Sequence, residues 1–137
     1  MRKTRSPSNK SFEQEIVLQF LHMLTTVKLY HWKTHSFANH KATDELYGKL
    51  NDNIDKFVEV LLGKLGNRVD LTHIKCLPIC DFTSLEQMKR EIEKYKSYLV
   101  GLDSNKTMHL MSNTDLFNIR DEILGDLNQY LYLSTFQ

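Results

Sequence analysis

Proline and glycine are scarce in this sequence, which has two prolines and five glycines among its 137 residues. So few turn-forming residues argue against a β-sandwich, because its many short strands need frequent tight turns. The same scarcity favours long helices. The length suits one domain with a single core, so we expect one all-α domain.

Long apolar runs are missing as well. Charged residues interrupt each hydrophobic stretch before it reaches the roughly 20 residues of a membrane span. The basic N-terminal residues lack the apolar segment of a secretory signal, and two cysteines are too few for a disulfide framework. These absences predict an intracellular, reducing location with no membrane span.

The positive charge is unevenly distributed. The first ten residues carry four basic and no acidic side chains, whereas residues 11–137 carry 14 basic and 17 acidic ones. This pattern predicts a basic flexible tail over residues 1–10 and a folded domain over residues 11–137. Nucleic acid is a suitable partner for the tail, through Arg2, Lys3, Arg5 and Lys10. A solvated terminus without a partner is the alternative interpretation.

The spacing of apolar residues predicts four amphipathic helices, at about 11–32, at 37–65, from 83 or 84, and from near 113. Ser11 with Gln14, and the overlapping pairs Thr83 with Glu86 and Ser84 with Gln87, have the spacing of capping boxes, and Gly66 supplies a stop. Residues 66–82 form a long crossover between the second and third helices, whereas the other connections are short. This order is that of a ferritin-like four-helix bundle with one long crossover.

Four residues with metal-binding side chains share one side of the second predicted helix within an arc of about 100°. They are His40, Asp44, Asp55 and Glu59. The two pairs lie about 22 Å apart along the helix, so one helix cannot close a single site with all four. Two copies running antiparallel could do so, and leucines outside the core stripe of the first helix suggest such a subunit contact. Ordinary acidic residues at the border of an apolar stripe are the alternative.

The residues around this set resemble the signature of Dps proteins, mini-ferritins that protect DNA. The similar residues run from Lys28-Leu-Tyr-His31-Trp32 through Phe37, His40-xxx-Asp44-Glu-Leu-Tyr47 and Asp55-xxx-Glu59. Four stretches resemble still more closely an uncharacterised family from large DNA viruses and phages. They are His-Trp-x-Thr-x-Ser from His31, His-Lys-Ala from His40, Asp-Lys-Phe-Val-Glu-Val from Asp55 and Ile-Arg-Asp-Glu-Ile-Leu-Gly-Asp from Ile119.

The Dps resemblance implies a di-iron ferroxidase centre at a two-fold interface, in a dimer or a larger shell. One chain would supply His31, His40 and Asp44, and the other would supply Asp55 and Glu59. Such a centre oxidises Fe(II) with peroxide or dioxygen. The interval from His31 to His40 is three residues shorter than is usual in Dps proteins. This difference and the viral resemblance support the alternative of a metal-free structural or virion-associated protein with other virion proteins as partners.

Three further features remain. Glu122 and Asp126 are additional candidate ligands if a metal site closes within one chain.

Arg120 falls at the centre of the apolar face of the fourth predicted helix and needs an acidic partner, either Glu15 or a site carboxylate. The crossover contains the sequence motif H-x2-C-x3-C, which comprises His73, Cys76 and Cys80. Zinc would need a fourth ligand and usually a tighter cysteine spacing, which favours free, partly buried thiols.

Overall fold

The computed structural model describes residues 11–109 and 112–136, and every regular element among them is helical. The elements are α1 (Phe12–Lys33), α2 (Phe37–Leu65), α3 (Leu85–Gly101), the 3-10 helix η1 (Leu102–Ser104), α4 (Lys106–His109) and α5 (Thr114–Leu133). The prediction of an all-α domain is therefore confirmed for this part of the chain. The predicted basic tail lies outside the described residues, so DNA binding through it stays a prediction.

The helix boundaries agree with their sequence signals. Two of the three predicted capping boxes form: the Ser11 hydroxyl accepts the backbone N–H of Gln14, and the Ser84 hydroxyl accepts that of Gln87. The N-cap of α3 is Ser84, so the overlapping pair of Thr83 with Glu86 does not cap it. At the end of α2, Gly66 adopts a left-handed conformation with φ of 74°, which glycine accepts without steric cost. Its N–H bonds to the carbonyl oxygen of Leu62 and closes the helix.

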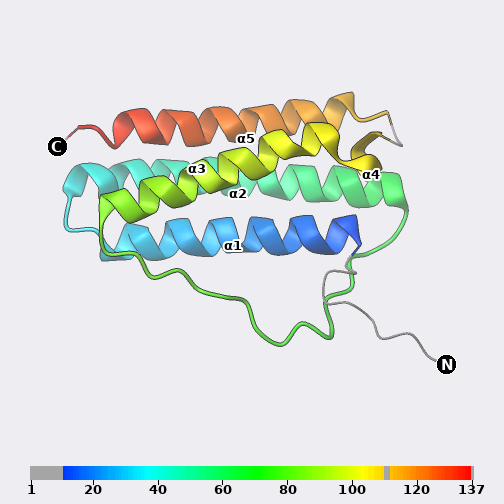
Figure 1. The fold of residues 1–137 in the computed structure, drawn as a ribbon, viewed down its shortest axis with the longest axis horizontal. Coiled ribbons are helices and arrows are strands. Elements are labelled where there is room, and N and C mark those ends of the chain that lie inside the picture. Colours follow the sequence, from blue (N-terminus) through cyan, green and yellow to red (C-terminus); the bar gives the residue numbers. More distant parts are fainter. Residues whose placement is uncertain (1–10, 110–111, 137) are drawn as a thin grey trace.

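The chain path sets which helices run in the same direction. A three-residue turn makes α1 and α2 antiparallel, and residues 66–84 then run back along α1 to the other end of the molecule (Figure 1). As a result α3 runs parallel to α2, and α5 returns antiparallel to α3 (Figure 1). The helix α2 packs against both α1 and α5, and α5 packs against α3.

Each long helix contributes an apolar stripe to one core. At its centre the ring of Phe20 from α1 meets that of Phe57 from α2 edge-on, with centroids 5.3 Å apart. Ile92 from α3 and Ile123 from α5 are fully buried in the same core. Burial of these stripes is the main stabilising contribution that holds the helices together.

The connection between α3 and α5 differs from the simple short link that the sequence suggested. It contains η1 and α4, and the side chain of Met108 in α4 is buried in the core. This short helix closes one end of the apolar interior. None of the described helices is long and apolar enough to cross a membrane.

Candidate metal centres

The turn between α1 and α2 brings His31 and His40 together. The imidazole rings stack with centroids 4.0 Å apart and planes inclined by 18°. Nδ1 of His31 lies 2.9 Å from the carbonyl oxygen of His40, and Nδ1 of His40 lies 3.0 Å from the carbonyl oxygen of His31. A carbonyl oxygen only accepts, so each Nδ1 carries the proton. In the neutral rings both Nε2 atoms therefore keep a free lone pair.

The carboxylates predicted to join these histidines are not gathered in one chain. Asp44 lies one turn after His40 and is exposed, while Asp55 and Glu59 are exposed much further along α2. The distance along the helix between the two pairs is about 22 Å. The ligand atoms of His31, His40 and Asp44 are not all within 4.8 Å of one another, so a single chain presents two separate and incomplete groups. We call His31, His40 and Asp44 the histidine half-site, and Asp55 and Glu59 the acidic half-site.

The surface between the two half-sites is partly apolar. Leu21 and Trp32 of α1 are 41% and 68% exposed. They line an open pocket of about 450 Å³ that also contacts Tyr47 of α2. A neighbouring hollow of about 280 Å³ extends the groove from Leu21 to Asp55 of the acidic half-site. Exposed apolar surface of this kind marks a contact region in many proteins.

The two additional candidate ligands on α5 do not form a metal cluster with these groups. Glu122 is exposed. Asp126 is half-buried, and its Oδ2 accepts a hydrogen bond of 2.8 Å from Nδ2 of Asn53. Burial raises the pKa of Asp126, and the charge of Glu122 raises it further, against the opposing effects of Asn53 and Lys49. The geometry assigns Asp126 to the contact between α5 and α2.

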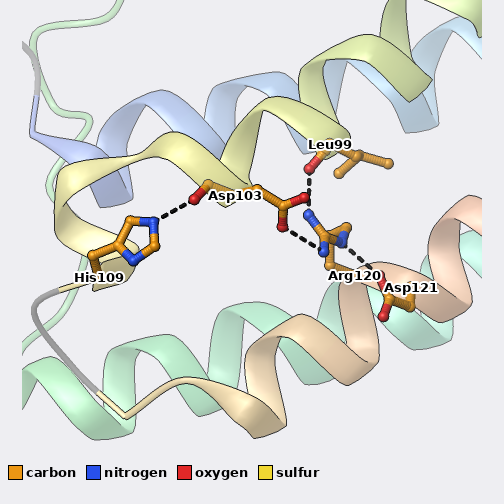
Figure 2. Close-up of polar contacts among 5 residues, drawn as sticks. All are labelled: Leu99, Asp103, His109, Arg120 and Asp121. Atoms are coloured by element: carbon orange, nitrogen blue, oxygen red, sulfur yellow. Dashed lines mark hydrogen bonds and ion pairs between the residues drawn. The ribbon is translucent and has the colours of Figure 1, made fainter.

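Arg120 has partners other than those expected. Its side chain is 8% exposed and reaches α3 and η1, where it donates to the Leu99 carbonyl and to Asp103 (Figure 2). It also donates to the neighbouring Asp121 of α5. The carboxylate of Asp103 accepts from the guanidinium at 2.9 Å, and that of Asp121 accepts at 2.7 Å. The expectation of Glu15 or a site carboxylate was wrong, because η1 places Asp103 against α5. Sequence periodicity does not reveal that placement.

A different group of ligand-type side chains meets beside the crossover. In the part of the chain that the structure describes, one set of three His, Cys, Asp or Glu residues has its ligand atoms all within 4.8 Å of one another. The set is His22 of α1, Cys80 of the crossover and Glu91 of α3. We call it the crossover cluster. Cys80 is thus grouped with His22 and Glu91, while His73 and Cys76 are exposed and stand apart from it.

Three contacts define the crossover cluster. Nε2 of His22 lies 3.2 Å from Oε2 of Glu91 and 3.6 Å from Sγ of Cys80, while its Nδ1 lies 3.2 Å from the carbonyl oxygen of Pro78. The side chains of His22 and Glu91 are 19% and 11% exposed. Burial raises the pKa of the Cys80 thiol, and the negative charge of Glu91 raises it further. The edge of Tyr95 packs against the His22 ring.

Comparison with known proteins adds one family. The family of unknown function DUF5856 matches residues 31–133, which is three quarters of the chain. The chain belongs to DUF5856. No curated protein and no solved structure matches it.

The DUF5856 match covers both half-sites as well as Cys80 and Glu91, and it begins after His22. His22 and Glu91 are not among the candidate ligands that the sequence patterns predicted. A signal existed for Glu91, because it lies three residues after Met88 and four before Tyr95, which places an acid beside the buried stripe of α3. His22 carried no comparable signal, since one histidine on a long helix is compatible with many environments.

Proposed function

We propose that this DUF5856 protein is an iron-binding subunit with a ferritin-like fold, a four-helix bundle with one long crossover. In this proposal two copies pair through the α1 and α2 surface, and each histidine half-site faces the acidic half-site of the other copy. The observation that carries the proposal is the paired geometry of His31 and His40. Each ring is held through Nδ1 by a backbone carbonyl, which is how metal-binding histidines are commonly oriented.

The donor set suits iron. Imidazole nitrogen with carboxylate oxygen is typical of iron and other first-row metals, and the carboxylates supply the negative charge that a pair of divalent ions needs. Asp44 is close enough in sequence to join His40, and Asp55 and Glu59 stand side by side one turn apart. Fe(II) is the substrate in this scheme. Electrons released on its oxidation pass to peroxide or dioxygen.

The apolar groove supports pairing through this face. Leu21 and Trp32 lie between the half-sites, and a two-fold axis through the groove brings α2 against α2 in opposite directions. An isologous interface repeats each contact, so one dimer would hold two complete sites. A monomer would hold none, which makes the proposal sensitive to the oligomeric state.

The first test is a mixing experiment with two variants. We expect His40→Ala to disable the histidine half-site and Asp55→Asn/Glu59→Gln to disable the acidic half-site, so each protein alone should lose anaerobic Fe(II) uptake. Denaturing and refolding an equal mixture should restore about a quarter of wild-type uptake, because half of the dimers are mixed and each has one intact site. A Glu86→Gln/Glu93→Gln variant, which loses two exposed charges on α3, should bind iron normally.

Two outcomes of this experiment would contradict the proposal. If wild type takes up no more iron than the double carboxylate variant, the iron proposal is wrong and the metal-free structural interpretation replaces it. If uptake is normal but the mixture recovers nothing, the half-sites do not combine across a two-fold axis. Light scattering on the same samples should show the dimer.

A further inference from the structure

The crossover cluster brings an imidazole nitrogen, a cysteine sulfur and a carboxylate oxygen within 4.8 Å of one another. The carbonyl oxygen of Pro78 fixes the proton of neutral His22 on Nδ1, so Nε2 presents a lone pair. That lone pair faces the carboxylate of Glu91 at 3.2 Å and the sulfur of Cys80 at 3.6 Å. A neutral ring in this tautomer sets the lone pair of Nε2 against that of the carboxylate, and either a proton or a metal ion between them relieves the repulsion.

We propose that His22, Cys80 and Glu91 bind a zinc ion, which fastens the crossover to α1 and α3. Two of the three ligand–ligand separations match those of a tetrahedral zinc centre, and the third lies within 4.8 Å. Typical zinc bond lengths of about 2.3 Å to sulfur and about 2.0 Å to nitrogen and oxygen place the nitrogen and oxygen about 3.3 Å apart. The same geometry places the sulfur and nitrogen about 3.6 Å apart. The corresponding distances in the structure are 3.2 and 3.6 Å.

The ligand types favour zinc over the metals that suit the half-sites. A thiolate with an imidazole selects zinc among the common divalent ions, whereas the half-sites contain no sulfur. Without a cation, burial and Glu91 keep the thiol of Cys80 protonated. Binding of zinc releases that proton to solvent and forms the sulfur–zinc bond. The carbonyl of Pro78 then serves as the outer partner that orients the imidazole.

The position of the cluster explains what the ion would do for the fold. The crossover contains no regular helix or strand, and several of its residues, Cys76 and Ile79 among them, are exposed. Ligands from α1, the crossover and α3 would join three separate segments at one point. An open pocket of about 450 Å³ is lined by His22 and Pro78 but not by Cys80 or Glu91, and in the proposal a water molecule is the fourth ligand. None of these residues belongs to the iron half-sites, so this site is independent of the proposed function.

Cobalt(II) provides a direct probe, because a cobalt–thiolate bond gives charge-transfer absorption that nitrogen and oxygen ligands cannot give. We expect full-length, tag-free protein to bind one Co(II) per chain with this absorption and with the strong visible bands of a tetrahedral ion. Zinc should remove both signals at one equivalent. Cys80→Ser should abolish the charge-transfer absorption, and the matched variant Cys76→Ser should retain it, since Cys76 is exposed and outside the cluster.

Two more variants separate the site from a simple ion pair. His22→Ala and Glu91→Gln should each weaken zinc binding by about 100-fold or more, because even outer partners of a ligand contribute about 10- to 100-fold. Circular dichroism checks that each variant is folded. Absence of charge-transfer absorption in wild type, or its persistence in Cys80→Ser, would overturn the zinc proposal. The first outcome means that a proton on His22 occupies the space, as an imidazolium paired with Glu91.

Discussion

Two polar clusters are attached to the same helix, α3, and they differ in their balance of donors and acceptors. Near the end of α3, the buried guanidinium of Arg120 donates to the carbonyl of Leu99 and to the carboxylates of Asp103 and Asp121 (Figure 2). Near its start, the ligand atoms of His22, Cys80 and Glu91 converge. Protein groups satisfy the first cluster, while the second gathers the ligand types of the proposed zinc site.

The difference shows why a buried polar group alone says little about function. Burial lowers the pKa of Arg120, but hydrogen bonds and charge from Asp103 and Asp121 outweigh this effect and raise it overall. The arginine therefore stays charged and acts as a structural link between α5 and α3. None of the three side chains of the crossover cluster is a permanently charged donor, so a proton or a metal ion has to supply the positive charge beside Glu91. Counting donors against acceptors thus distinguishes a structural cluster from a candidate metal site.

The largest expected effect is the dependence of stability on zinc. At free zinc about 100-fold above the dissociation constant, the free energy of unfolding of wild type should rise by about 2.7 kcal/mol. Urea unfolding with zinc and with a chelator measures this difference. Cys80→Ser should show none of the increase, while Cys76→Ser should show all of it. An equal increase in all three proteins would place the zinc elsewhere and remove the contrast between the clusters.

Removal of the balanced cluster should have an effect that zinc does not change. Arg120→Met keeps the apolar stem of the side chain but removes the charged donor to the Leu99 carbonyl, which keeps the backbone N–H of Leu102. We expect a loss of about 2 kcal/mol in urea unfolding, because a hydrogen bond to a charged group contributes about 1.5–3 kcal/mol. The loss is moderate since Asp103 and Asp121 are each 61% exposed and can be hydrated. A loss that appears only without zinc would show that the two clusters are coupled.

The smallest effect concerns Asp126, an intermediate case with one acceptor facing one donor, Asn53. Its pKa is raised above 3.8 in the folded state, so the carboxylate costs stability at neutral pH, and this cost disappears as the pH falls below about that value. Asp126→Asn should therefore stabilise the protein at pH 7 by at most about 0.5 kcal/mol, because solvent screens this partly exposed group. The gain should vanish near pH 3. Destabilisation at pH 7 would assign Asp126 a favourable charge interaction.

Local sequence signals predicted most of the helical structure. The bounds of α2, the two capping boxes and the stop at Gly66 agree with the structure because each depends on residues within a few positions of one another. The segment from η1 to α4 was not predicted in this detail. Its short helices depend on contacts such as the burial of Met108, which local spacing does not reveal.

The same division applies to the candidate sites. Helical periodicity alone placed His40, Asp44, Asp55 and Glu59 on one side of α2, since all four belong to one regular helix. The crossover cluster draws its ligands from three segments, and His22 and Cys80 are 58 positions apart in the chain. No periodicity links residues on different elements. Sequence therefore determined the helices and their faces, whereas the path of the crossover along α1 decided that His22, Cys80 and Glu91 meet.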